Sequence, residues 1–105
     1  MIGDSVSVRS VPYFQERFPH GAIDAAVNRQ IYVGREVYDS YRDQGLVGGI
    51  VVLALGTNGP ATDGQLDDIV ADVGTDKQLW LVNTRSPQSW MAETNAALDR
   101  AAERY

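Results

Sequence analysis

The sequence predicts an α/β domain built on a doubly wound parallel sheet, and three observations lead to this prediction. Segments with the apolar spacing of strands alternate along the chain with segments that have the spacing of helices. The clearest strand, residues 49–55 (GIVVLAL), is a continuous apolar run typical of a parallel strand covered on both faces. No repeat, linker or low-complexity segment divides the 105 residues, so we expect a single domain over 1–105.

The first half of the chain predicts a short strand, a helix, a weak strand and a second helix. The first helix should follow Ile2, end at Pro19 and be kinked or restarted by Pro12. Its inner face is expected to hold Val6, Val8, Val11, Phe14 and Phe18. Residues 21–27 are a weak strand, and the second helix ends at Gly45. The residues expected to face the sheet from this second helix are Tyr32, Val33, Val37, Tyr38 and Tyr41.

The second half predicts two further strand and helix pairs. Residues 49–55 lead through a glycine-rich loop into a third helix, for which Thr62 or Asp63 is the expected cap. The apolar side of that helix comprises Leu66, Ile69, Val70 and Val73. Residues 78–84 form the next strand, and Ser86 and Pro87 are the expected start of a last helix. The apolar positions of this helix are Trp90, Met91, Ala97, Leu98 and Ala101.

Charge and composition exclude several functional classes. The net charge of −5 arises from 14 acidic and 9 scattered basic residues, so no nucleic-acid partner is expected. The absence of cysteine excludes disulfides, thiolate zinc sites and thiol nucleophiles. The longest apolar run is far below the roughly 20 residues that cross a bilayer. We interpret the acidic cluster of the third helix as a solvated face and expect neither a metal nor a cofactor; its members are Asp63, Asp67, Asp68 and Asp72.

Polar residues follow the predicted strands at the edge where parallel sheets bind ligands. Ser5 is expected at the start of the first helix, where free N–H groups favour a developing negative charge. Asn58 and the backbone N–H near Asn28 could donate to the same oxyanion. Taken alone, each motif is more often structural, because Asp-Ser is a common capping pair and Gly-Thr-Asn-Gly is a common turn.

In combination, Gly-Asp-Ser after the first strand and Gly-x-Asn after the long apolar strand resemble the SGNH, or GDSL-like, hydrolase superfamily. The resemblance spans the whole chain and implies a flavodoxin-like, three-layer fold. The stretches IGDSV, AVNRQ, ALGTNG and VNTRSPQSW are similar to the extracytoplasmic SGNH domain of membrane acyltransferases, which include peptidoglycan O-acetyltransferases. The resemblance makes Ser5 the nucleophile and Asn58 an oxyanion donor, while Asn28 replaces the glycine of a segment that usually reads Val-Gly-Arg-Gln.

The resemblance also implies the reaction and its partners. Ser5 would take an acetyl group from an acyl ester donor and pass it to a cell-wall carbohydrate outside the membrane. Arg29, Gln30 and Arg85 fall on the same edge, and the two guanidinium groups suit an anionic group of the substrate. For each arginine taken separately, a solvated or ion-paired surface role is the alternative.

The expected base is missing from the sequence. The family supplies it in an Asp-x-x-His block near the carboxyl terminus, whereas the single histidine, His20, follows the first helix. A helix of that length would separate it from Ser5 by roughly 20 Å. We therefore expect a fold that is incomplete at both ends, with the base beyond Tyr105 and any membrane segment before Met1. A second peptide or a neighbouring molecule could complete the fold, or the fold could stay incomplete.

Three functions are thus open at this point. The first is a serine acyltransferase whose isolated fragment is inactive. The second is a general carboxylesterase of the same superfamily. It would differ from the acyltransferase in that no glycan acceptor competes with water for the acetyl group. The third is a non-catalytic carbohydrate-binding or partner-binding module, which would keep its ligand affinity after Ser5→Ala.

Overall fold

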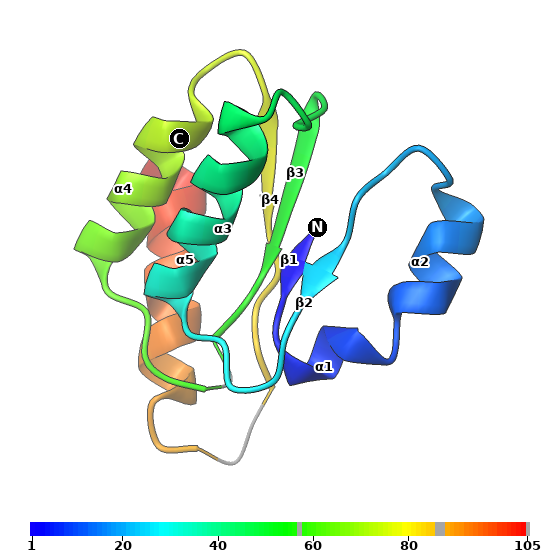
Figure 1. Ribbon diagram of the computed structural model, residues 1–105. Helices are drawn as coiled ribbons and strands as arrows, with labels where there is room; N and C mark the ends of the chain where they lie inside the picture. Colours follow the sequence, from blue (N-terminus) through cyan, green and yellow to red (C-terminus); the bar gives the residue numbers. More distant parts are fainter. Residues whose placement is uncertain (57, 86–87, 105) are drawn as a thin grey trace.

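The computed structural model describes residues 1–56, 58–85 and 88–104 and has a parallel sheet flanked by helices (Figure 1). The sheet has four strands in the order β2-β1-β3-β4, and all of its pairs are parallel. This arrangement confirms the predicted fold class. The elements are β1 (Ile2–Gly3), α1 (Ser5–Val8), α2 (Val11–Arg17), β2 (Asp24–Ala25), α3 (Ile31–Asp43), β3 (Ile50–Ala54), α4 (Asp63–Val73), β4 (Gln78–Leu81) and α5 (Met91–Arg104).

Strand β1 has only two residues but occupies an inner position of the sheet. Its Ile2 lies opposite Asp24 of β2 on one side and Leu53 of β3 on the other. Because the strands are parallel, their carboxyl ends share one edge, at the bottom of Figure 1. We call this edge the rim; its described residues are 4–5, 26–30, 55–56, 58–62 and 82–85, of which Ser5 is the first residue of α1 and the others lie in loops.

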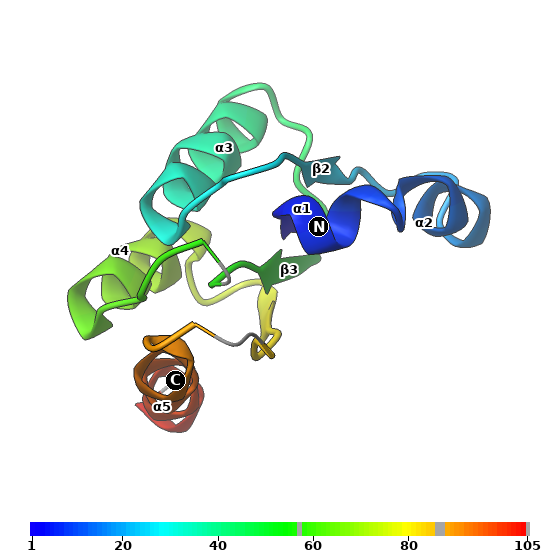
Figure 2. The same ribbon diagram turned by 90° about the horizontal axis from the view of Figure 1, so that it is seen from below.

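Helices α3, α4 and α5 cover one face of the sheet, which we call the covered face (Figures 1 and 2). Alternate residues of β3 and its extension point into it, and Leu53 and Leu55 are 2% and 1% exposed. Helix α3 approaches closely because Gly34 has no side chain: a Cβ there would lie 2.5 Å from Leu55 Cδ1. The core is completed by residues of the three helices, including Ile31, Tyr38, Leu66, Ile69, Val73, Ala97, Leu98 and Ala101.

The opposite face of the sheet, the open face, carries exposed apolar side chains. Ile50 of β3 is 61% exposed and Trp80 of β4 is 60% exposed. Helix α2 has no buried residue and stands away from the sheet in Figure 2. Between α2 and the strands lies a cavity of about 610 Å³, whose lining includes Phe14, Phe18 and Val52. The prediction that residues 49–55 are buried on both faces is therefore wrong for the open face. Helix α2, which lies on this side of the sheet, stands away from the strands and does not bury them.

The first predicted helix is divided into α1 and α2, with Pro12 in the first turn of α2, as its fixed φ favours. The inner face assigned to it is wrong, because Val6 is 67% exposed and Phe18 is 53% exposed. The rings of Phe14 and Phe18 instead pack on each other with centroids 5.1 Å apart. Tyr32 was expected to pack on the sheet and is likewise exposed, since it points outward from the first turn of α3.

The ends of the other elements follow local signals. Gly45, with φ +72°, lies just beyond α3 and confirms its predicted end. Thr62 rather than Asp63 caps α4, in a reciprocal capping box with Gln65. Strand β4 is shorter than predicted, and α5 begins only at Met91. The predicted cap at Ser86 and Pro87 lies outside the described residues, and no helix within the described ranges is long and apolar enough to cross a membrane.

Candidate active site

The nucleophile candidate, Ser5, is the first residue of α1 and is exposed at the rim. The helix is capped by Asp4, whose Oδ1 accepts a hydrogen bond from the Val6 N–H at 3.0 Å. Asp4 is 1% exposed, so the cap lies under the turn. The capping role considered for the Asp-Ser pair thus belongs to the Asp4 side chain.

The turn into Ser5 requires glycine at position 3. A Cβ on Gly3 would lie 2.4 Å from the buried Ser7 Oγ, so a side chain would displace the first turn of α1. Since α1 has only four residues, its dipole is small. An oxyanion formed at Ser5 would therefore need individual N–H groups rather than a long helix for its stabilisation.

Asn58 lies at the rim beside the loop that follows β2. Its Nδ2 donates to the Arg29 carbonyl oxygen at 3.2 Å. An amide nitrogen has two N–H groups, so this bond fixes the side chain and leaves a second donor. The neighbouring Gly59 lies against the Gln30 side chain, because a Cβ there would be 3.0 Å from Gln30 Oε1.

Asn28 has a left-handed backbone, with φ +62°, and no other non-glycine residue in the described part of the chain has a positive φ. Asparagine is one of the few side chains that adopt this conformation readily. The conformation gives a physical reason why the similar segments usually have glycine at this position. Asn28 is exposed, and its N–H makes no hydrogen bond to another described residue.

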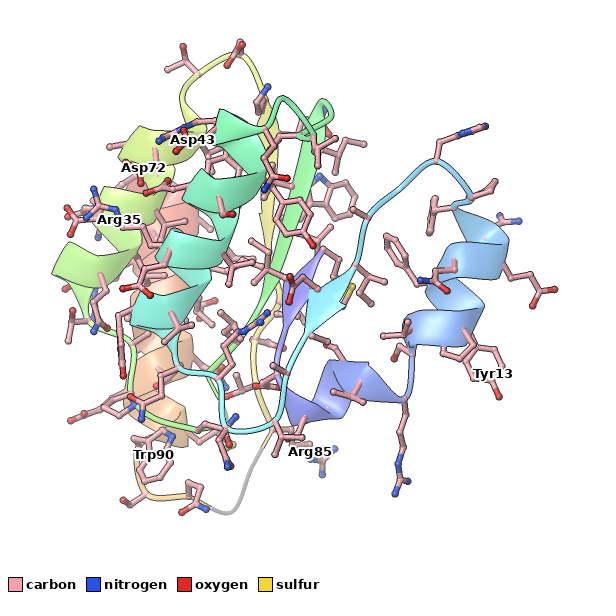
Figure 3. All side chains as sticks on the ribbon, viewed as in Figure 1. Tyr13, Arg35, Asp43, Asp72, Arg85 and Trp90 are labelled. Carbon is pink, nitrogen blue, oxygen red and sulfur yellow. The ribbon has the colours of Figure 1, made fainter. Side chains whose placement is uncertain are left out.

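The Arg29 guanidinium is bonded within the protein, mainly to Asp24 of β2. Its Nη2 lies 2.7 Å from Asp24 Oδ1, and its side chain is only 10% exposed. Burial of Asp24 opposes ionisation, but the hydrogen bonds from Arg29 and Tyr41 outweigh it and lower the pKa of the carboxyl below 3.8. These contacts do not favour a substrate-binding role for Arg29. The predictions for Gln30 and Arg85 stay open, and both side chains are exposed; Arg85 is labelled at the rim in Figure 3.

Known proteins match this chain over almost its whole length. It is 38% identical over 98% of its residues to peptidoglycan O-acetyltransferase OatA of Listeria monocytogenes. It is 34% identical over 99% of its residues to O-acetyltransferase OatA of Staphylococcus aureus. The chain spans only 16% and 17% of the lengths of these two relatives. No protein-family model matches the sequence.

A solved structure matches the fold as well. It is the C-terminal catalytic domain of Streptococcus pneumoniae peptidoglycan O-acetyltransferase A (OatA), with a methylsulfonyl adduct; the TM-score is 0.72 and the identity 27%. The match covers 98% of this chain and 57% of that domain. The chain is a homologue of the OatA catalytic domain. The resemblance found in the sequence is thereby confirmed.

Two residues of α5 that the sequence analysis did not single out fix the rim loops of this OatA homologue. Thr94 is fully buried, and its Oγ1 accepts a hydrogen bond from the Ala61 N–H at 3.1 Å. Asn95 bonds to both backbone groups of Thr84, accepting from its N–H at 2.7 Å and donating to its carbonyl oxygen at 2.8 Å. A threonine among the apolar positions of the last helix was the available signal for this role.

Trp90, which ends the VNTRSPQSW stretch and was also expected among the apolar positions of the last helix, contacts the rim (Figure 3). Its Nε1 donates to the Gly56 carbonyl oxygen at 3.2 Å, and Gly56 is two residues before Asn58 in the same loop. Gly56 has φ +132°, and a Cβ there would lie 2.6 Å from Thr84 Cγ2. Glycine is therefore required where the loops after β3 and β4 meet.

No base contacts Ser5 among the described residues. His20 precedes β2, whereas Ser5 follows β1, so the two lie at opposite ends of parallel strands. His20 is exposed beside the open face. This placement supports the prediction that His20 is not the base of Ser5.

The acidic cluster is ion-paired as well as solvated. Each of its four aspartates lies within 4.0 Å of an arginine, and Arg35 meets Asp72 between α3 and α4 (Figure 3). The described residues contain no group of three His, Asp or Glu side chains that could hold a metal ion.

Proposed function

We propose that this chain supplies the nucleophile and the oxyanion-binding groups of a serine O-acetyltransferase. The observation that carries the proposal is the convergence at one rim of an exposed Ser5, a left-handed Asn28 and an Asn58 amide held by the neighbouring loop. Homology to the catalytic domain of a peptidoglycan O-acetyltransferase supports acetyl transfer to cell-wall glycan, and we propose that this transfer takes place outside the cytoplasmic membrane.

The proposed reaction has two acyl-transfer steps. Ser5 Oγ attacks the carbonyl carbon of an acetyl ester while a base accepts its proton, and the carbonyl oxygen becomes an oxyanion. The Ser5 N–H, the Asn28 N–H and the second N–H of Asn58 Nδ2 are the proposed donors to that oxyanion. Collapse expels the protonated alcohol and leaves acetyl-Ser5. A carbohydrate hydroxyl, or water, then attacks this ester and regenerates Ser5.

We further propose that polypeptide outside these 105 residues supplies the base, in an Asp-x-x-His block, and covers the open face. Two observations support this. The solved OatA domain is longer than the matched region, which covers 57% of it. The sheet also exposes Ile50 and Trp80 on a face that parallel sheets normally bury.

Sulfonylation of Ser5 tests the site directly. We expect methanesulfonyl fluoride to label the full-length gene product at Ser5, as seen by mass spectrometry of its peptides, and the 105-residue chain to react far more slowly. Ser5→Ala should abolish labelling and acetyl transfer, whereas Ser10→Ala, an exposed serine without a side-chain cap bond, should leave both unchanged. Robust turnover by the pure 105-residue chain would contradict the proposed missing base.

Two alternatives retain specific support. A carboxylesterase has the same rim, and it is separated from a transferase by acceptor competition: soluble peptidoglycan fragments should divert acetyl groups from water only in a transferase. A non-catalytic glycan-binding module fits the absence of a base near Ser5 in the described residues. In that case Ser5→Ala in the full-length product would keep its affinity for the same fragments, and the parent protein would show no acetyl transfer.

A further inference from the structure

We infer that Arg29 is a positioning residue that joins three rim loops and thereby holds Ser5 and Asn58 in register. The inference rests on the proposed function, because the groups that it positions are the proposed nucleophile and oxyanion donor. It replaces the expected substrate-binding role of this side chain.

The first contact anchors Arg29 to β2. Its Nη2 pairs with Asp24 Oδ1 at 2.7 Å, and its Nη1 donates to the Asp24 carbonyl oxygen at 2.9 Å. Tyr41 of α3 holds the other carboxylate oxygen, Oδ2, at 3.0 Å. The anchor is thus tied to both the sheet and the covered-face helix.

The second contact reaches the turn that carries Ser5. Arg29 Nη1 also lies 3.4 Å from the Gly3 carbonyl oxygen, at the long end of the hydrogen-bond range. The Ala26 N–H donates to the same oxygen at 3.2 Å. Gly3 is two residues before Ser5 and has no space for a side chain, so a shift of this carbonyl would move the nucleophile.

The third contact uses the main chain of the same residue. The Arg29 carbonyl oxygen accepts the bond from Asn58 Nδ2, which orients the proposed oxyanion donor. The guanidinium of Arg29 therefore holds the end of β1 that leads to Ser5, and its main-chain carbonyl holds the loop after β3. The left-handed turn at Asn28 gives Arg29 the backbone direction for both contacts.

The fork shape of the guanidinium makes this role specific to arginine. Its nitrogens reach the Asp24 carboxylate and two carbonyl oxygens together, whereas a lysine ammonium is a single point of charge. A lysine would keep the charge and the pairing with Asp24 but lose the simultaneous contact with Gly3. Donors fixed in advance are what stabilise an oxyanion, so loosening this register should slow the chemical step.

The test compares R29K with Y41F in the full-length gene product, using para-nitrophenyl acetate as the acetyl donor. Both variants reduce the number of hydrogen bonds to Asp24, but only R29K also loses the contact with the Gly3 carbonyl oxygen at the rim. We expect R29K to lower kcat about tenfold with KM within about twofold, and Y41F to leave both within about twofold. A raised KM with unchanged kcat would instead mean that Arg29 binds substrate and would overturn the inference, as would an equal loss of kcat in Y41F. If R29K does not fold by circular dichroism, D24N replaces it and should lower kcat at constant KM.

A second readout does not need activity. With isotopically labelled asparagine, the Asn58 side-chain amide resonances, assigned by their loss in N58D, should move toward solvent-exposed values in R29K and stay in place in Y41F. Unchanged resonances in R29K would overturn the inference. If the wild-type protein shows no Ser5-dependent turnover, the proposed function fails, while these resonances still decide whether Arg29 holds Asn58.

Discussion

The two faces of the sheet differ in what their apolar residues contact. On the covered face, Leu53 and Leu55 of the β3 segment are almost fully buried under α3, α4 and α5. On the open face, Ile50 of the same strand and Trp80 of β4 are more than half exposed. Residues of a single strand thus have opposite environments, because the side chains along the strand alternate between the faces. An apolar side chain stabilises the fold only where another element packs on it.

The largest expected effect is the difference between Leu53→Ala and Ile50→Ala. Leu53→Ala removes a buried side chain under three helices and should lower the free energy of unfolding by about 3 kcal/mol. Ile50→Ala removes a mostly exposed side chain and should cost less than about 1 kcal/mol, mainly through strand propensity. Urea unfolding of the two variants of the 105-residue chain measures both values. Equal losses would show that the open face is covered in solution, for instance by a second copy.

A second comparison uses two glycines in the helices of the covered face. Gly34→Ala forces a Cβ to within 2.5 Å of Leu55 Cδ1, whereas Gly64 of α4 has no neighbour within 4 Å of such an atom. We expect Gly34→Ala to lower the free energy of unfolding by about 2 kcal/mol through overpacking. Gly64→Ala should raise it by about 0.5 kcal/mol through helix propensity. If both variants gain stability, α3 can move away from the sheet and its close approach does not limit the fold.

Local sequence signals predicted most helices and strands, because the residues that determine where an element begins or ends lie within a few positions of that boundary. Pro12, Gly45 and Thr62 mark boundaries through their own backbone or capping chemistry. The alternation of strands and helices was sufficient for the parallel sheet. Burial at Val6 and Phe18 was predicted wrongly because an apolar spacing shows which face of a helix is apolar but not whether a partner packs on it.

The candidate site also contains some residues that the sequence identified and others whose contacts it could not predict. Ser5, Asn28 and Asn58 were identified from short motifs whose chemistry is local. The role of Arg29 depends on its pairing with Asp24 and its reach to Gly3, and no spacing rule predicts the direction of a flexible side chain. Asn95 was missed as a rim contact for the same reason, and the partner of Trp90 could not be named, because the groups that they bond lie on other loops.

A third and smaller effect concerns how α4 is held on the covered face. Thr62 caps the helix, and Thr62→Ala removes the hydrogen bond that the Gln65 N–H donates to the Thr62 Oγ1 at 3.2 Å. We expect a loss of about 1 kcal/mol in the free energy of unfolding. Thr75→Ala, an exposed threonine beyond the end of α4, is the control and should be neutral. A loss in the control equal to that of Thr62→Ala would mean that the cap contributes nothing specific.

The smallest expected effect is a pH dependence at Asp24, where β2 meets both Arg29 and α3. Because these contacts lower the pKa of Asp24 below its ordinary 3.8, the folded state favours the ionised carboxyl. The resulting stability is present above that value and is lost as the pH falls through the folded pKa. Asp24→Asn should therefore reduce the free energy of unfolding at neutral pH and make its decline in acid less steep. Tyr41→Phe removes one of the two side-chain donors to Asp24, so its pH profile should lie between those of Asp24→Asn and the wild type. Urea titrations at a series of acidic pH values measure this slope. If the Asp24→Asn profile parallels wild type, the acid sensitivity arises elsewhere, and the anchor that we assign to Arg29 on β2 is weaker than its short contact indicates.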